Sequence, residues 1–219
     1  MSNEDNKKKP SLFGMITNPT EQLERLRGRP HIWGALAVVT VLFMFGSWLA
    51  TLGIEIDYGV DLTPEEEQFA HLFSIITMVA VGFFGPTFSV LILSVIYLII
   101  AKIAQSDVTF KQLFSMNTYI MIISTLGLII NNAIAIFIGS NPEVPITSLG
   151  SILNVPGVAG AALESIELFT IWGMIVAVIG LQKVARFSKG LAWGVQIALF
   201  IIGMIFAMIG AGIGEMLGG

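Results

Sequence analysis

Residues 72–101, LFSIITMVAVGFFGPTFSVLILSVIYLIIA, decide the class of this protein, because 30 consecutive positions contain no Asp, Glu, Lys or Arg. A helix rises about 1.5 Å per residue, so roughly 20 apolar residues cross a hydrocarbon core about 30 Å thick. The segment is therefore predicted to be a membrane-spanning helix with length to spare. Gly85 and Pro86 in its middle predict a kink, because proline lacks a backbone N–H and clashes with the preceding turn.

The rest of the chain has the same character, with 55% hydrophobic residues, 12% charged residues and a mean hydropathy of +0.85. A water-soluble domain could not keep so much apolar surface away from water. We expect an all-α membrane bundle, with a cytoplasmic segment at 1–30 and a transmembrane domain at 31–219. The expected spans are residues 32–53, 72–101, 116–139, 166–181 and 191–213. The fourth span is short and needs a few residues from the preceding turn or a locally thin bilayer.

Basic residues predict the orientation, because positively charged loops stay on the cytoplasmic side. All eleven flank one side of the expected spans: Lys7, Lys8, Lys9, Arg25, Arg27, Arg29, Lys102, Lys111, Lys183, Arg186 and Lys189. Segments 54–71 and 140–165 and the C-terminus after 213 contain none and are acidic instead. We therefore expect a cytoplasmic N-terminus and an external C-terminus.

A short helix is expected before the first span, in ITNPTEQLERLRGRP. Asn18 suits the N-cap, Pro19 the first helical position, and Glu21 completes a capping box. Leu23 and Leu26 share one face, which is typical of a helix lying at the membrane interface. The basic residues expected to reach anionic lipid headgroups are Arg25, Arg27 and Arg29. The alternative is that these arginines only fix the topology.

The external segments carry two further signals. In DLTPEEEQFAH, Thr63 is a predicted N-cap and Pro64 a first helical residue, so the second helix is expected to begin in water outside the membrane. The acidic residues that follow suit a helix N-terminus, and a cation site is the alternative. The loop 140–165 is apolar in part and could lie on or dip into the outer leaflet.

Asn131 and Asn132 interrupt the apolar stretch LGLIINNAIAIF at 126–137. Neighbouring residues on a helix point about 100° apart, so the two amides cannot face one partner. The favoured interpretation is that they form hydrogen bonds between helices. Contact with a transported substrate or ion is the alternative.

Small residues recur at helical spacing in the last two spans. They are Gly173 and Ala177 in the fourth span, and Gly203, Ala207 and Ala211 in the fifth. Small residues let helix backbones approach closely, so these spans are predicted to pack together, within one chain or in a homodimer.

The sequence offers no catalytic constellation. Cysteine is absent, and the two histidines, His31 and His71, fall at opposite ends of the expected spans. Glu164 and Glu167 are expected to share one face in the first turn of the fourth span, where a coupling-ion site is a minor alternative. No enzyme activity, cofactor, metal site or nucleic-acid partner is predicted.

The layout resembles the Yip family of five-span proteins (Ypt/Rab-interacting protein type) in its compact bacterial form. The resemblance is carried by SLFGMITNPTEQLERLRGRP, by GFFGPTFSVLILSVIYLIIAKIAQSDVTFKQLFSMNTYIMI and by IWGMIVAVIGLQKVARFSKGLAWGVQIALF, and it covers almost the whole chain. It implies a location in the bacterial plasma membrane and no catalytic residues. It also implies an accessory role beside a membrane complex such as an ABC exporter that protects the cell against toxic peptides.

Two functions follow as hypotheses. The first is a non-enzymatic membrane scaffold or accessory protein whose partners are the lipid bilayer and other membrane proteins, ABC exporter subunits among them. The second is a small transporter or channel whose polar path includes Asn131 and Asn132 and the helix break at Gly85 and Pro86.

Overall fold

The structure, a computed structural model, describes residues 9–52, 63–141 and 144–218, and the regular elements in these ranges are all helices. The helices are α1 (Leu12–Thr17), α2 (Pro19–Gly28), α3 (Trp33–Leu52), α4 (Pro64–Ile103), α5 (Phe110–Ile138), α6 (Leu149–Leu153), α7 (Gly157–Glu164), α8 (Leu168–Lys183) and α9 (Lys189–Gly218). The expected all-α class is confirmed. Gly53, which ends the expected first span, lies outside the described residues, as do Asp57, Asp61 and Glu143 of the acidic segments.

Four of these helices, α3, α4, α5 and α9, are long and apolar enough to cross a membrane. They match the first, second, third and fifth expected spans, which confirms a polytopic membrane bundle. The expected fourth span corresponds to α8, whose 16 residues rise about 24 Å, short of a core about 30 Å thick. A fourth crossing of the membrane would therefore need α6 and α7, which precede α8 in the chain, in addition to α8.

Several helix boundaries follow local sequence signals. Thr63 caps α4 in a capping box with Glu66, so the helix does begin at Pro64, eight residues before the expected span. Thr109 and Gln112 form a second capping box at the start of α5. The capping box predicted at Asn18 is wrong, because this side chain accepts no hydrogen bond from the helix and instead donates to Glu21 Oε2 at 2.9 Å.

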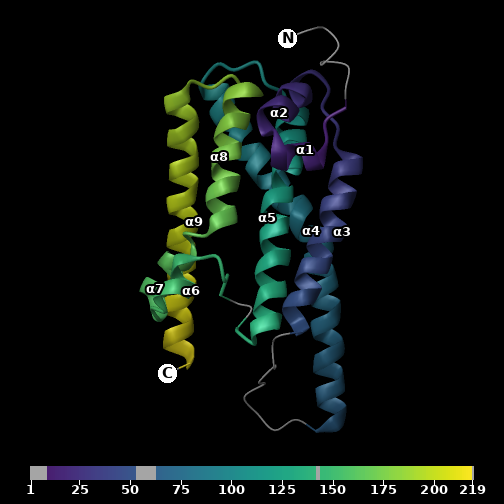
Figure 1. Cartoon of the computed structure of the whole chain (residues 1–219), viewed down its shortest axis with the longest axis vertical. Helices are drawn as coiled ribbons and strands as arrows, with labels where there is room; N and C mark the ends of the chain where they lie inside the picture. The colour runs from purple at the N-terminus through teal and green to yellow at the C-terminus, as the bar shows by residue number, and fades with distance from the viewer. Residues whose placement is uncertain (1–8, 53–62, 142–143, 219) are drawn as a thin grey trace.

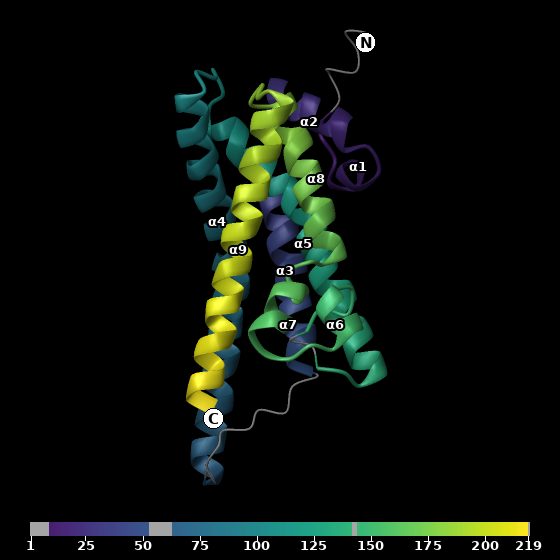
Figure 2. The same ribbon diagram turned by 90° about the vertical axis from the view of Figure 1, so that its left-hand side faces the viewer.

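The central helix of the bundle is α5, which contacts α1, α2, α3, α4 and α8. Figure 1 shows α3 on one side of it and α8 on the other, with α9 outermost beyond α8. The short helix α7 contacts α9, and α6 packs against α7 on its other side, as Figure 2 also shows. Helix α4 continues through Gly85 and Pro86 without interruption, and the kink there stays a prediction.

The best-packed part of the core lies at the end of the bundle that carries the basic residues. There α1 and α2 pack against the start of α5 and the end of α8. The fully buried side chains in this region include Met15, Leu23, Leu26, Leu113, Met116 and Leu181. The apolar face of α2 is thus turned into the protein, and the N-terminal segment shares the core of the transmembrane helices.

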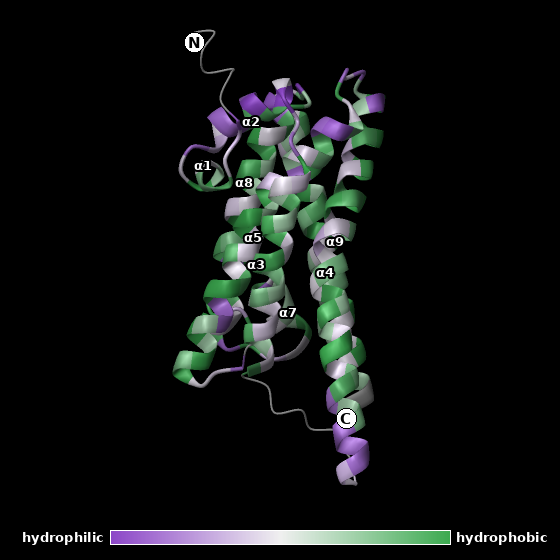
Figure 3. Ribbon diagram, turned by 90° about the vertical axis from the view of Figure 1, so that its right-hand side faces the viewer, coloured by the Kyte–Doolittle hydropathy of each residue, from purple (hydrophilic) through white to green (hydrophobic). Residues whose placement is uncertain are grey.

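The opposite end of the bundle is loosely covered. The N-terminal part of α4 extends away from the other helices, and its large apolar side chains, such as Phe69, Phe73 and Ile76, are exposed. Figure 3 shows that hydrophobic residues predominate along both α4 and α9. Exposed apolar helices of this length are what a bilayer would surround.

Candidate functional site

A buried polar cluster joins α5, the α5–α6 connection and the start of α8. At its centre is Asn131, 7% exposed, whose Oδ1 accepts hydrogen bonds from the Thr147 backbone N–H at 2.9 Å and the Thr147 hydroxyl at 3.0 Å. Its Nδ2 donates to Glu167 Oε1 at 3.3 Å. One amide therefore ties a loop residue and a helix N-terminus to the central helix.

Glu167 is the N-cap of α8, and 7% of its surface is exposed. Its Oε2 accepts from the backbone N–H of Thr170 at 2.7 Å and the hydroxyl of Thr170 at 2.9 Å. Its Oε1 accepts from the Phe169 N–H at 3.0 Å and the Thr147 hydroxyl at 2.5 Å. The carboxylate thus sits against the positive end of the helix dipole and is surrounded by donors, which offsets the cost of its burial.

The expectation that Glu164 and Glu167 share one helix face is wrong. Glu164 is the last residue of α7, whereas Glu167 precedes the first residue of α8. The chain turns between them, where the backbone N–H of Leu149 donates to the Ile166 carbonyl at 3.0 Å and that of Leu168 to the Thr147 carbonyl at 3.3 Å. The two carboxylates therefore do not form a pair on α8.

Asn132 makes a separate contact. Its Nδ2 donates to the backbone carbonyl of Gly46 on α3 at 2.9 Å. The helices are close at this point, since a Cβ on Gly46 would lie 2.9 Å from Leu128 Cδ2 on α5. Asn131 and Asn132 thus act on different neighbours, as their angular separation on the helix requires.

Thr147 and Glu167 are hydrogen-bond partners of Asn131 that the sequence did not predict. Thr147 lies in a loop with no helical periodicity, so nothing in its neighbourhood indicates a partner on α5. Glu167 belongs to a residue type that is uncommon as an N-cap, and the sequence placed it inside the first turn of the fourth span rather than before it.

The predicted small residues have diverse surroundings. Gly173 and Ala177 line a cavity bounded by α4, α5, α8 and α9. Gly203 and Ala207 are exposed on α9, and Ala211 is half-buried. The spans α8 and α9 do contact each other, and the C-terminal part of α9 contacts α7. Close packing of these small residues on one another stays a prediction.

The three arginines of the N-terminal segment make contacts within the protein. Arg25 forms an ion pair with Glu21, and only 12% of its side chain is exposed. Arg27 Nη1 donates to the Lys183 carbonyl at 3.4 Å, and Arg29 also has an interaction within the chain. Binding of lipid headgroups by Arg25, Arg27 and Arg29 stays a prediction.

The chemistry of the cluster is that of a structural connection. Its acidic group, Glu167, is held by hydroxyl and amide donors, and the cluster contains no histidine or second carboxylate for proton transfer. In the described residues there is also no group of three His, Cys, Asp or Glu side chains able to hold a metal ion.

Fold and cluster together define a class: a multi-pass membrane helix bundle with a buried polar junction. The model of the Yip1 domain matches residues 13–211. The chain belongs to the Yip1 domain family, whose members are generally non-enzymatic membrane proteins. It is 32% identical over 218 residues to the membrane protein YknW of Bacillus subtilis, covering 96% of this chain and 94% of that protein. No solved structure shows significant similarity.

Proposed function

We propose that this protein is a non-enzymatic accessory protein of the bacterial plasma membrane that binds other membrane proteins within the bilayer. Subunits of an ABC exporter that protects the cell against toxic peptides are the partners implied by the family resemblance. The N-terminus lies in the cytoplasm in this proposal, and α6, α7 and α8 together complete the fourth crossing.

The observation that carries the proposal is the unoccupied small-residue surface of α9. A Cβ added to Gly203, Gly210 or Gly214 would have no other atom within 4 Å, apart from the local helix backbone. The same helix exposes large apolar side chains, among them Phe206 at 69% and Ile209 at 51%. In a membrane, helix association depends on close packing, and small residues allow a second helix to approach.

Affinity purification from native membranes in a mild detergent tests the proposal. The wild-type chain is expected to bring down membrane proteins, and Gly210→Leu combined with Gly214→Leu is expected to lose most of them. Gly34→Leu is the matched control, because Gly34 on α3 is also open to its surroundings. Absence of any membrane partner with the wild-type chain would contradict the proposal. Co-purification of two differently tagged copies would identify the partner as a homodimer.

A transporter or channel path along Asn131 and Asn132 has less support, because both amides donate to protein acceptors, Glu167 and Gly46. Solute or ion flux into liposomes, abolished by Asn131→Leu with Asn132→Leu, would favour that alternative.

A further inference from the structure

A cavity of about 400 Å³ lies within the bundle between α4, α5, α8 and α9. Its size falls in the range of small-molecule sites, roughly 300–1,000 Å³. Most of its lining is apolar and includes Leu93, Met121, Met174 and Phe200. Among the described residues that line it, none carries a charge. The cavity therefore suits a neutral, largely apolar ligand and disfavours a charged headgroup.

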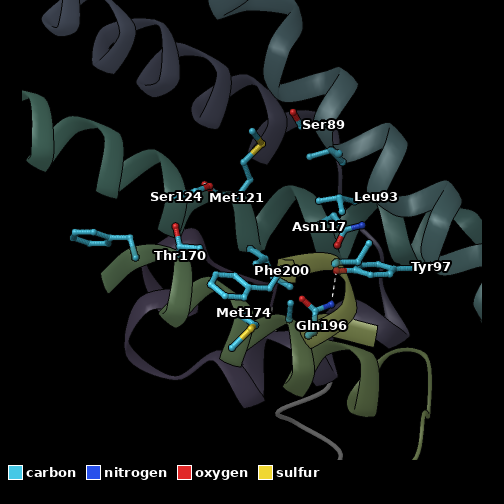
Figure 4. A pocket seen from close by; sticks show the side chains of 16 residues that line it. Ser89, Leu93, Tyr97, Asn117, Met121, Ser124, Thr170, Met174, Gln196 and Phe200 are labelled. Carbon is cyan, nitrogen blue, oxygen red and sulfur yellow. Dashed lines mark hydrogen bonds between the residues drawn. The ribbon is translucent and has the colours of Figure 1, made fainter. Parts of the chain in front are cut away.

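Three buried polar side chains meet at one end of this cavity, as Figure 4 shows. Tyr97 is 2% exposed, and Asn117 and Gln196 are each 6% exposed. Gln196 Nε2 donates to the Tyr97 hydroxyl at 2.5 Å, which links α9 to α4, and Asn117 Nδ2 donates to Ser94 Oγ at 2.9 Å. Both amide groups are thus held in a fixed orientation by their nitrogen atoms.

The oxygen atoms of the same amides are unused. Within the described part of the chain, neither Gln196 Oε1 nor Asn117 Oδ1 accepts a hydrogen bond, and the hydroxyl hydrogen of Tyr97 has no acceptor. All three residues line the cavity, so two acceptors and one donor at the same end of it are available to a ligand. A ligand hydroxyl fits this set, because it both donates and accepts.

The position of the polar groups matches a lipid of the inner leaflet. Tyr97 precedes the end of α4 by six residues, and Asn117 and Gln196 each follow the start of their helices by seven. At about 1.5 Å per residue, all three lie about 10 Å inside the basic end of the bundle. From there the lining continues to Ser89 and Phe169, deeper in the membrane. This is the geometry of a polar head followed by a chain.

We propose that the cavity binds one neutral, hydroxyl-bearing lipid of the monoacylglycerol or long-chain alcohol class. The hydroxyl lies between Gln196, Asn117 and Tyr97, and the acyl or alkyl chain follows α8 past Ala177 and Gly173. The ligand enters sideways from the bilayer between α4 and α9.

Three probes with the same chain and different heads test the proposal on the full-length protein in detergent micelles: 1-monooleoylglycerol, methyl oleate and oleate. Binding is measured by titration with native mass spectrometry. We expect one bound monooleoylglycerol per protein, with an affinity at least about threefold higher than that of methyl oleate. One hydrogen bond in a membrane contributes about 0.6 kcal/mol, which corresponds to this factor. Oleate is expected to bind most weakly, because its charge would be buried without a partner.

Two glycine variants separate the cavity from general lipid contact. Gly173 lines the cavity, and a Cβ there meets no atom within 4 Å, so Gly173→Leu fills the space without a clash at its Cβ. It is expected to weaken monooleoylglycerol binding at least about tenfold. Gly194 on α9 is equally open but does not line the cavity, so Gly194→Leu is expected to keep the wild-type affinity.

Gln196→Leu tests the polar end and is expected to remove the preference for monooleoylglycerol over methyl oleate while both still bind. Its thermal unfolding is measured alongside, because the variant also loses the bond to Tyr97. Equal affinity of the wild-type chain for both probes, or unchanged binding in Gly173→Leu, would overturn the proposal and assign the lipid to the outer surface.

Discussion

Asn131 on α5 and Glu167 at the start of α8 are joined by a hydrogen bond of 3.3 Å, although 36 positions separate them in the chain. The Thr147 hydroxyl lies between them, 3.0 Å from Asn131 Oδ1 and 2.5 Å from Glu167 Oε1, so these two acceptors share its single hydrogen. This triangle fixes where the chain enters α8 after the two short helices. Because α8 alone is too short to cross a bilayer, the position of its N-terminus decides how deep the α6–α7 segment lies.

Asn131→Leu should destabilise the protein more than Asn132→Leu. The first change leaves the Thr147 amide without its acceptor and takes one donor from Glu167, and a buried group left unpaired costs about 1–3 kcal/mol. The second removes a single bond to Gly46, and such bonds in membranes average about 0.6 kcal/mol. Equilibrium unfolding in mixed micelles measures both free energies. Ile130→Leu, a lipid-exposed neighbour, serves as the control, and equal losses for the two Asn variants would contradict the prediction.

Glu167→Gln should loosen the segment that contains α6 and α7. The amide nitrogen of glutamine would face N–H or O–H donors of Thr147, Phe169 or Thr170, so at least one hydrogen bond is lost and the favourable charge at the helix N-terminus disappears. We expect faster amide hydrogen exchange across residues 145–167. Glu164→Gln changes the same residue type three positions earlier, at the end of α7, and should leave the exchange unaltered. Similar exchange rates in both variants would show that Glu167 does not hold the segment that contains α6 and α7.

Gly127→Ala should be more damaging than the same change at Gly173. A Cβ on Gly127 would lie 2.7 Å from Phe169 Cβ, an atom close to the backbone that cannot easily move, whereas one on Gly173 meets nothing within 4 Å. Overpacking of this kind costs about 1–3 kcal/mol. Tryptophan fluorescence followed during thermal unfolding compares the two, and a Gly127→Ala variant as stable as Gly173→Ala would show that α5 and α8 can move apart at no cost.

The sequence predicted those features that depend on local patterns. The apolar runs located α3, α4, α5 and α9, and the Thr63–Pro64 pair located the start of α4. The sequence did not predict the contacts between segments that are distant in the chain. Thr147 has no local feature that points to Asn131, and the burial of Leu23 and Leu26 depends on the facing surfaces of α5 and α8. The amide oxygens of Asn117 and Gln196 that accept no hydrogen bond can be identified only once α4, α5 and α9 are placed beside one another.

The orientation of the chain can be tested with single cysteines, because the protein contains none of its own. Ser188 precedes α9 at the basic end of the bundle, and Met216 is 85% exposed near the other end of that helix. The positive-inside rule places Ser188 in the cytoplasm and Met216 outside. In intact cells, a membrane-impermeant maleimide should therefore label Met216→Cys and spare Ser188→Cys, and both should react once the membrane is permeabilised. The reverse pattern in intact cells would invert the topology, and it would place the hydroxyl-binding end of the cavity in the outer leaflet.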